Sequence, residues 1–426
     1  MTCPDCEPLA RRVAELEALV QKLEARIAQL ERKKPRREPP AFVKEDTMPV
    51  EPKPSGRPEG HEGVGRETPE EIHREEKIAA VATCPDCGSP VRQKRVRRRT
   101  ITRLVPGKLE NVRYEIPQGY CKQCHKPVEP IVPNALPNTP FDLTLLIWIA
   151  CLRMLGVSVD KVRFLLKTDY GLRLSSATVT NNVAKLAEFL GEDYEQLRKE
   201  LLKQRQVHGD ETGWRVRGKN WWLWEFISQK QAYFTIRHTR SHTVPASIMT
   251  GYDGVFTSDF WNAYNCLKCE KQRCWVHLKR ELDKVLKHRR DYEFATFASQ
   301  LMRLYYWAKS ERNHGAKTRA FAEERLQAII SKGYENKDCK RLVKTLTRYQ
   351  NELFTFCAHR GVKSGNNDAE RGIRPAVVIR KTSFGSQSER GAKSTAVMMS
   401  FFQTARLQDQ NFIEYVQELA NNRLQT

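Results

Sequence analysis

The sequence lacks a long apolar run. Its best candidate, Leu143–Leu155, falls short of the ~18 consecutive apolar residues of a membrane-spanning helix, and Arg153 interrupts it. The first residues include acids and no apolar signal-peptide core, so we expect neither a membrane span nor secretion. Acids are also in deficit, since 73 Lys and Arg face 51 Asp and Glu and leave a formal charge of +22. Such a charge favours a polyanionic partner, most often nucleic acid.

Many of the cysteines lie in short paired motifs. In the N-terminal third of the chain six of the twelve form three Cys-x-x-Cys pairs, which are Cys3/Cys6, Cys84/Cys87 and Cys121/Cys124, and Cys266 and Cys269 have the same spacing. Without a secretion signal, this pairing favours zinc over disulfides, and a reducing compartment. The second and third pairs predict a zinc ribbon with one structural Zn²⁺, because four thiolates leave no open coordination position for catalysis. The first pair has no second pair nearby. It is compatible both with a zinc ion shared between two chains and with free thiols.

The length of 426 residues predicts several domains. Residues 7–33 carry a heptad pattern with branched residues at the a positions and leucine at the d positions: Val13, Val20 and Ile27, then Leu16, Leu23 and Leu30. This pattern predicts a parallel two-stranded coiled coil and hence a homodimer, with a helix that packs on its own domain as the alternative. Residues 34–78 are rich in Pro and charge and poor in large apolar side chains, so we expect a disordered linker.

Residues 79–135 form the predicted zinc ribbon, which we expect to bind DNA. Between its two cysteine pairs, residues 92–103 hold seven Lys or Arg and no acid. This density suits phosphate contacts, although a solvated strand face has the same composition. The predicted contacts are Arg92, Lys94, Arg95, Arg97, Arg98 and Arg99.

Residues 136–205 show helical patterns, at Leu143–Leu155, Val159–Leu166 and Ser175–Leu190. The last two helices and the turn between them resemble a helix-turn-helix motif, whose second helix reads a DNA groove. The predicted groove contacts are Ser176, Thr178, Thr180 and Asn181. A plain helical connector is the alternative interpretation.

From residue 206 the periodicity becomes that of strands. Val207–Trp214, Asn220–Ile227 and Ala232–His238 predict an antiparallel meander, and Gly254–Asp259 predicts a further strand. This order is that of an RNase H-like α/β fold, in which acids on the first and fourth strands lie close together. Asp210 and Asp259 occupy those positions. Glu211 follows Asp210 directly, so on a strand it should point to the opposite face.

The third candidate acid is Glu370, in the first turns of a predicted helix, with Asp368 on the far side of that helix. Phosphodiester cleavage and strand transfer use two divalent ions about 4 Å apart. Mg²⁺, or Mn²⁺ in its place, prefers carboxylate oxygens. Basic residues around Glu370 predict a DNA-binding cleft: Arg371, Arg374, Arg380 and Lys381.

These motifs together resemble a bacterial or archaeal insertion-sequence transposase of the family numbered 66. The motifs that carry the resemblance are Asp210-Glu211-Thr212, Asp259 followed by an aromatic residue and Ala263-Tyr264, Cys274-Trp275-Val276-His277, and Asn366-Asn367-Asp368-Ala369-Glu370-Arg371. The resemblance implies a zipper, a zinc ribbon, a helix-turn-helix segment and an Asp-Asp-Glu catalytic domain. It also implies that Asp210, Asp259 and Glu370 hold the catalytic metal ions, and that element-encoded helper proteins assist the chain.

Asp259 and Glu370 are 111 residues apart, which predicts an all-helical insertion. We therefore expect a catalytic core in two parts, residues 206–276 and residues 361–426 with C-terminal helices, around an insertion at residues 277–360. For His277 we favour a structural or DNA-proximal role. A zinc site with Cys266, Cys269 and Cys274 is the alternative, although a strand is expected at Cys266–Cys269.

We thus expect a cytoplasmic, nucleoid-associated DNA transposase. It would bind double-stranded element ends, hydrolyse the phosphodiester bond with two Mg²⁺ ions, and join the freed 3′-hydroxyls to target DNA. A DNA-binding regulator without chemistry and a structure-selective nuclease of the same fold are the alternatives.

Overall fold

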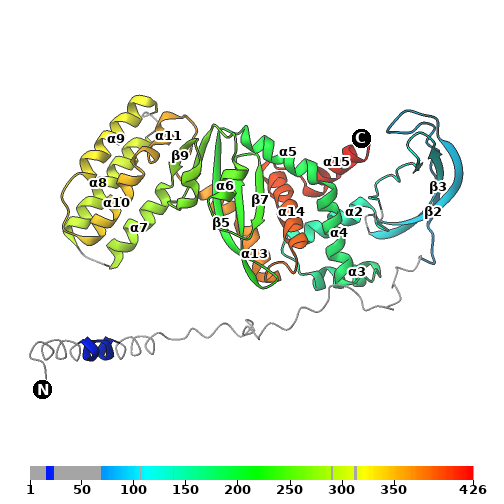
Figure 1. The fold of residues 1–426 in the computed structure, drawn as a ribbon, viewed down its shortest axis with the longest axis horizontal. Coiled ribbons are helices and arrows are strands. Elements are labelled where there is room, and N and C mark those ends of the chain that lie inside the picture. The colour runs from blue at the N-terminus through cyan, green and yellow to red at the C-terminus, as the bar shows by residue number, and fades with distance from the viewer. Residues whose placement is uncertain are drawn as a thin grey trace, which may run out of the picture. The chain divides into compact units, whose positions relative to one another are not determined.

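The computed structural model describes residues 16–23, 69–105, 107–137, 139–288, 291–310 and 314–425 (Figure 1). The chain divides into two units, residues 1–67 and residues 68–426. In the first unit residues 16–23 are helical, and the side chains of Leu16, Val20 and Leu23 are about half exposed (49%, 52% and 55%). Most of the predicted coiled coil, most of the predicted linker, and the Cys3/Cys6 pair lie outside the described residues.

The second unit begins with a small sheet of four strands: β1 (Arg74–Lys77), β2 (Arg92–Val105), β3 (Lys108–Cys121) and β4 (Lys126–Val128). The long strands β2 and β3 form an antiparallel hairpin, while β1 pairs parallel to the other edge of β3. The prediction that the disordered linker extends to residue 78 is therefore wrong at its end. Strand β1 has a polar sequence, and backbone bonds to β3 order it, which composition does not reveal.

Four helices follow this sheet: α2 (Leu143–Met154), α3 (Val159–Tyr170), α4 (Ser176–Phe189) and α5 (Gly191–Leu202). Ser158 and Ser175 cap the first turns of α3 and α4 with their hydroxyls. Helix α3 continues one turn beyond its predicted end at Leu166 and stops at Gly171, which adopts a left-handed conformation (φ 65°).

A five-stranded mixed sheet contains β5 (Gln206–Val216), β6 (Lys219–Ile227), β7 (Ala232–Arg237), β8 (Val255–Ser258) and β9 (Glu270–Arg273). The strand order is β7-β6-β5-β8-β9. The first three strands are antiparallel neighbours, whereas β8 pairs parallel with β5 and with β9. This places β5 at the centre of the sheet, with β8 beside it.

Two short elements connect the strands, α6 (Thr243–Ile248) and the 3₁₀ helix η1 (Asn262–Cys266). The predicted strand at Cys266–Cys269 is wrong, because Cys266 ends η1 and β9 begins only at Glu270. The 3₁₀ turn buries Tyr264 in the core beneath the sheet, and this tertiary contact overrides the local strand pattern.

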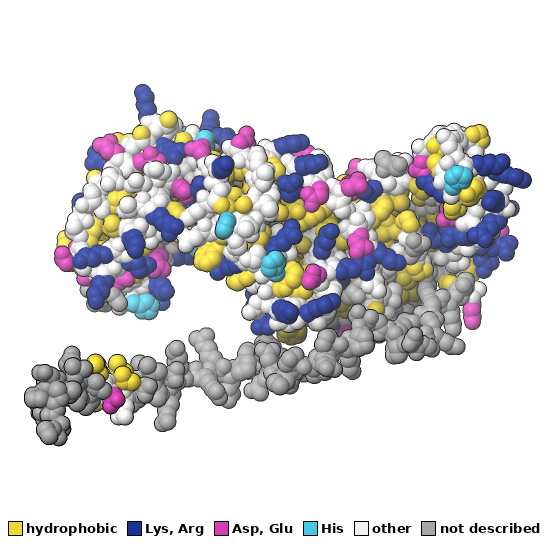
Figure 2. Space-filling model, viewed as in Figure 1, with side chains coloured by type: hydrophobic (Ala, Val, Ile, Leu, Met, Phe, Trp, Pro, Cys, Tyr) yellow, Lys and Arg dark blue, Asp and Glu magenta, His cyan; other side chains and the backbone are white. Residues whose placement is uncertain are grey.

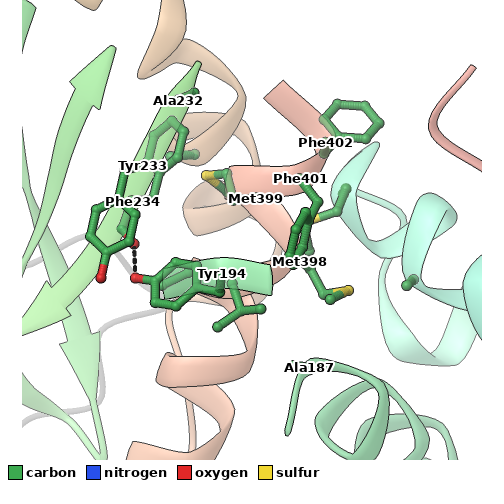
Figure 3. Close-up of a cluster of buried hydrophobic side chains, with 14 of the residues drawn as sticks. Ala187, Tyr194, Ala232, Tyr233, Phe234, Met398, Met399, Phe401 and Phe402 are labelled. Atoms are coloured by element: carbon green, nitrogen blue, oxygen red, sulfur yellow. Dashed lines mark hydrogen bonds between the residues drawn. The ribbon is translucent and has the colours of Figure 1, made fainter. Parts of the chain in front are cut away.

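The β7 edge of the sheet is covered by side chains rather than by another strand. Ser400 and Thr404 of α14 (Glu389–Leu407) accept the backbone N–H groups of Phe234 and Ala232 at 2.8 and 3.1 Å. The hydroxyl of Tyr194 donates to the carbonyl of Phe234, and this bond lies beside a cluster of Met and Phe side chains from α14 (Figure 3). These bonds satisfy polar groups that an edge strand leaves open.

Helices fill the chain between β9 and the last part of the core: α7 (Trp275–His288), α8 (Tyr292–Lys309), α9 (Ala316–Ile330), α10 (Lys337–Arg348), η2 (Gln350–Glu352) and α11 (Thr355–Ala358). They pack around a hydrophobic core of their own, separate from that of the sheet (Figure 1). The predicted helical segment between Asp259 and Glu370 is thus present. The chain then forms α12 (Asn367–Gly372), α13 (Arg374–Ser383), α14 and α15 (Phe412–Gln425).

In the part of the chain that the structure describes, no helix is both long enough and apolar enough to cross a membrane.

We expect Ser400→Ala to lower the free energy of unfolding by about 1–3 kcal/mol, because it leaves the buried N–H of Phe234 without an acceptor. Urea denaturation followed by circular dichroism measures this loss. Ser394→Ala on the same helix is the matched control, since the Ser394 hydroxyl only donates back to the carbonyl of Arg390. Equal losses in the two variants would contradict the capping role of Ser400.

Candidate functional site

Asp210 lies in the middle of β5, directly opposite Glu225 of β6. One of its oxygens, Oδ1, accepts the backbone N–H of Glu211 at 2.8 Å. The preceding residue, Gly209, packs against Phe256 and Tyr264 so closely that a Cβ atom would overlap the Phe256 ring. Glycine at this position therefore lets the strand approach the core beneath it while Asp210 faces the other side.

Asp259 and Glu370 reach the same region from other segments. Asp259 directly follows β8, the parallel neighbour of β5, and its Oδ1 accepts the N–H of Trp261 at 2.9 Å. Glu370 lies on α12, which packs on β5 and β6. At Gly372 of that helix a Cβ atom would overlap the Glu225 carboxylate, so glycine is required for the close packing.

Asn366 joins α12 to β5. Its side-chain amide donates to the carbonyl of Gly209 at 2.9 Å, and its side-chain oxygen lies 3.1 Å from Nδ1 of His208. Its backbone N–H donates to the sulfur of Cys274, at the start of α7, at 3.0 Å. Since Asn366 is only 1% exposed, water does not compete for these bonds. They position the helix that carries Glu370 beside the strand that carries Asp210.

The environment of Asp210 disfavours its charged form. Burial is the main cause that raises the pKa of Asp210 to about 7, and the negative charges of Glu211, Asp259 and Glu370 raise it further. The charges of Asp259 and Glu370, from two other segments of the chain, thus add to the effect of burial on Asp210.

Glu370 has a cationic partner from α7. Arg280 donates from Nη1 and Nη2 to both carboxylate oxygens, at 2.6 and 2.9 Å, and Nε2 of His277 lies 3.7 Å from Oε1. The Arg280 guanidinium is the main reason that the pKa of Glu370 lies below its ordinary value. Among the described residues, the three acids are not gathered within 4.8 Å of one another as a group of metal ligands would be.

Glu211 lies on the opposite face of β5 from Asp210, as the alternation of strand side chains predicts. It accepts hydrogen bonds from the hydroxyl of Tyr264 and from the guanidinium of Arg240. Arg240 in turn lies over the rings of Trp222 and Trp261, 4.6 and 4.0 Å from their centroids. Although its hydrogen bonds act in the other direction, burial raises the pKa of Glu211 above its ordinary value.

Glu225 is an acid that the sequence reasoning missed. It is fully buried, and neither carboxylate oxygen has a hydrogen-bond partner among the described residues. Burial raises its pKa far above the ordinary value, and the charge of Asp210 adds to this effect. We therefore expect Glu225 to be neutral. A single acid within the apolar run Trp221–Ile227 is the signal that could have identified it.

Comparison with known proteins gives the family. The sequence model described as Transposase IS66 family matches residues 156–394, which is more than half of the chain and includes all three acids. The chain belongs to the transposase IS66 family. It is also 22% identical over 221 residues to the uncharacterized protein y4qI of Sinorhizobium fredii (strain NBRC 101917 / NGR234). That alignment covers 44% of this chain and 40% of the relative, so the chain matches less than half of the relative's length.

Four basic residues near Glu370 were predicted to contact DNA in this IS66-family chain. Their exposure to solvent differs. Arg371, Arg374 and Lys381 are exposed, although Arg371 also pairs with Asp368 at 2.8 Å. Arg380 is partly buried, and its Nη1 donates to the hydroxyl of Thr212 and to the carbonyl of Gly213. The bonds of Arg380 therefore tie α13 to β5.

The predicted contacts in the four-stranded sheet are mostly exposed. Arg92, Lys94, Arg95 and Arg98 are exposed on β2, and Figure 2 shows Lys and Arg side chains gathered over β2 and β3. Arg97 is partly buried and pairs with Glu129 at 2.6 Å. Arg99 is half-buried, because its Nη2 donates to the carbonyls of Leu136 and Thr139. Arg99 thus serves the packing of β2 against the following loop.

The predicted groove contacts on α4 are accessible. Ser176, Thr180 and Asn181 are exposed, whereas Thr178 is partly buried and bonded to the capping hydroxyl of Ser175 at 2.8 Å. The opposite side of α4 packs against α2 and α14. The helix therefore presents one polar face to solvent.

The four ribbon cysteines come together as predicted. The sulfurs of Cys84, Cys87, Cys121 and Cys124 all lie within 4.8 Å of one another. The Cys84–Cys124 and Cys87–Cys121 distances are 3.9 and 3.5 Å, close to the ~3.8 Å edge of a tetrahedron with ~2.3 Å Zn–S bonds. Hydrogen bonds from Ser89 lower the pKa of Cys87 to about 6, which favours the thiolate. The cluster fits structural zinc.

The other cysteine motif does not form such a cluster. Within the described ranges, the ribbon cysteines are the only group of three or more candidate ligands at metal-binding distance, so Cys266, Cys269, Cys274 and His277 do not converge. Cys274 is buried and accepts the Asn366 N–H, while His277 lies beside Glu370. The structural or DNA-proximal role favoured for His277 stays a prediction.

The raised pKa of Asp210 predicts a pH-dependent stability. The unfolded value is about 3.9 and the folded value about 7, so the folded state binds more protons between them and loses stability as the pH rises through this window. Asp210→Asn removes the ionisable group. With a chelator present, we expect it to raise the free energy of unfolding by about 1–4 kcal/mol near pH 8 and by little near pH 4.

Urea denaturation at the two pH values tests this expectation. Asp253→Asn is the control, because Asp253 is exposed in the turn before β8 and should change stability little at either pH. An equal effect of Asp210→Asn at both pH values would show that repulsion and burial of its charge are not the cause.

Proposed function

We propose that the chain is an Asp-Asp-Glu transposase that cleaves DNA at element ends and joins the freed 3′-hydroxyls to target DNA. The observation that carries this proposal is the electrostatic coupling of Asp210 to both Asp259 and Glu370. The strand order β7-β6-β5-β8-β9, with Asp210 on β5 and Asp259 after β8, supports an RNase H-like catalytic domain. Membership of a transposase family supports the DNA substrate.

The chemistry of the three acids fits Mg²⁺. Their ligand atoms are carboxylate oxygens, which hard divalent cations prefer, and added positive charge would favour the charged form of Asp210. No Lys or Arg of the described residues forms an ion pair with Asp210 or Asp259, so these two acids have no competing cation. Bound there, two ions would activate the attacking oxygen and stabilise the leaving oxygen.

The reaction has two displacements at phosphorus. In the first, a water oxygen bonds to the phosphorus at the element end and the P–O3′ bond breaks, which leaves a 5′-phosphate and a 3′-hydroxyl; one water proton goes to the 3′ oxygen and the other to solvent. In the second, the oxygen of that 3′-hydroxyl bonds to a target phosphorus and its proton is released. The target P–O3′ bond breaks, and the departing 3′ oxygen takes up a proton. One bond forms for each bond broken, so no covalent link between protein and DNA is needed.

Basic groups beside α12 support a path for the DNA backbone. Two adjoining cavities are lined by cationic side chains from α12, α13, α14 and the loop before α12: Lys363, Arg371, Arg374 and Arg406. The side chain of Arg371 borders both cavities and is 67% exposed. Phosphate groups carry the charge that such a lining attracts.

We infer separate DNA-binding roles for the elements that precede the catalytic domain. The exposed cations of β2 suit phosphate contacts, and the polar face of α4 after the α3 turn suits a groove, as in a helix-turn-helix motif. The half-exposed apolar side chains Leu16, Val20 and Leu23 support a coiled-coil homodimer, in which a partner helix would cover them.

Loss of the Glu370 carboxylate should abolish chemistry without abolishing DNA binding. We expect Glu370→Gln to lower Mg²⁺-dependent cleavage of duplex DNA carrying the element ends by at least about 10³-fold, while the Kd for that DNA changes less than about threefold. Gel analysis of labelled strands measures nicked and joined products, and fluorescence anisotropy measures binding.

Glu324→Gln is the matched control, because Glu324 is an exposed acid on α9. Binding without metal-dependent cleavage in the unmodified chain would contradict the proposal and favour a DNA-binding regulator. Cleavage without joined products would instead favour a structure-selective nuclease.

The cysteine cluster predicts a definite zinc content. We expect about one Zn²⁺ per chain from the ribbon, or about 1.5 if Cys3 and Cys6 also share an ion between two chains. Cys121→Ser should remove about one Zn²⁺ per chain, because Cys121 is buried at the end of β3. Atomic emission of the purified protein measures the metal. Cys266→Ser is the control that should keep the full content, and retention of all zinc in Cys121→Ser would contradict the assignment.

A further inference from the structure

The further inference concerns Arg280 of α7, whose side chain is bonded to Glu370. Helix α7 begins at Trp275, and its first two turns direct His277 and Arg280 toward Glu370. Arg280 binds Glu370 with both arms of its guanidinium, and its own side chain remains 55% exposed. It is thus an accessible cation bonded directly to one of the three candidate metal ligands.

The Arg280 bond and a metal ion compete for the same atoms. The guanidinium uses both carboxylate oxygens of Glu370, and arginine does not lose its proton in proteins. A cation coordinated by Glu370 would lie close to the fixed positive charge of this guanidinium, and their repulsion disfavours holding both on the same carboxylate. Among the described residues, Glu370 is not within 4.8 Å of both aspartates as a common ligand group, which agrees with its being held by α7.

The helices that carry Arg280 and Glu370 are held together close to the two side chains. The start of α7 is tied to the segment before α12, because Trp275 donates its backbone N–H to the carbonyl of Ser364 at 3.0 Å and Cys274 accepts that of Asn366. The backbones of the two helices are thus connected close to Glu370. Separation of Arg280 from Glu370 is therefore expected to come from the two long side chains rather than from the helices.

A phosphodiester is the partner that suits the released guanidinium. It presents two oxygens in the same forked geometry as a carboxylate, and Arg binds both groups with paired hydrogen bonds. We propose that Arg280 is a catalytic residue that exchanges Glu370 for the phosphate of the strand being cut, so that DNA binding releases Glu370 to join Asp210 and Asp259. This inference rests on the proposed transposase function, because it takes Glu370 as a metal ligand.

Arg280 and Glu370 each keep a partner of opposite charge before and after the exchange. Before it, one guanidinium pairs with one carboxylate; after it, the guanidinium pairs with a phosphodiester of the same charge, and the carboxylate pairs with a dication. Because the Arg280 side chain is 55% exposed, solvent weakens its ion pair with Glu370, and we expect the pair to contribute little to folding. An effect of Arg280 on the chemistry is therefore separable from an effect on stability.

The test compares Arg280→Gln with Arg341→Gln, a matched variant. Arg341 of α10 bonds at 2.7 Å to Glu281 of α7, and the Arg341 side chain is 49% exposed. With Mn²⁺ alone and no DNA, we expect Arg280→Gln to bind the ion about two- to fivefold more tightly, because its competitor for Glu370 is gone. Calorimetric titration measures this affinity.

With saturating element-end DNA and Mg²⁺, we expect Arg280→Gln to cleave at least about 10²-fold more slowly, and Arg280→Lys to recover part of the rate. Arg341→Gln should keep both the Mn²⁺ affinity and the cleavage rate within about twofold. Tighter metal binding together with slower cleavage is a combination that a purely structural role does not produce. Urea denaturation of each variant confirms that it is folded.

Either of two results would overturn the inference: unchanged or weaker Mn²⁺ affinity in Arg280→Gln, or a cleavage rate close to that of the unmodified chain. Glu370→Gln separates this failure from failure of the proposed function. If Glu370→Gln loses cleavage while Arg280→Gln keeps it, only the role of Arg280 is wrong. If Glu370→Gln also keeps cleavage, the proposed metal site itself is wrong.

Discussion

The candidate site depends on the hydrogen bonds of Asn366. Its side-chain amide donates to the carbonyl of Gly209, and its side-chain oxygen lies beside the ring of His208. Its backbone N–H donates to the sulfur of Cys274. One buried residue thereby joins β5, α12 and the start of α7, although the bonded residues lie 92 to 158 positions apart in the chain. The positions of Glu370 and of its α7 partners all follow from this junction. A change at Asn366 is therefore expected to alter the position of Glu370 relative to Asp210.

Repulsion between buried acids is the second constraint on this region. Asp210, Glu211 and Glu225 all have pKa values above the ordinary range, chiefly because burial disfavours their charged forms. The fold offsets part of this cost with cations, since Arg240 binds Glu211 and Arg280 binds Glu370. Asp210 retains its raised pKa, so its burial lowers the stability of the fold at pH values where its carboxyl is charged. The helical insertion contributes to the site, because its first helix provides Arg280.

The elements that depend on local interactions along the chain were predicted well from the sequence. The elements that depend on contacts between distant segments were not. The meander of β5, β6 and β7 was predictable, because alternating side chains and short turns are local signals. The cysteine cluster was also predictable, since the spacing of two pairs is nearly sufficient to define a zinc ribbon. The strand expected at Cys266–Cys269 was wrong because burial of Tyr264 decides that segment. Strand β1 was missed because its order comes from pairing with β3 rather than from its own composition.

The sequence by itself determined the chemistry that is available: three acids in recognisable motifs, four paired cysteines, and basic segments around them. Tertiary structure alone decided which of these groups meet. The pairing of Arg280 with Glu370, the burial of Glu225 against Gly372, and the conversion of Arg99 and Arg380 into packing residues have no local signal. The physical reason is that backbone preference and side-chain periodicity act over a few residues. Charge pairing and burial instead depend on distances that only the packed elements define.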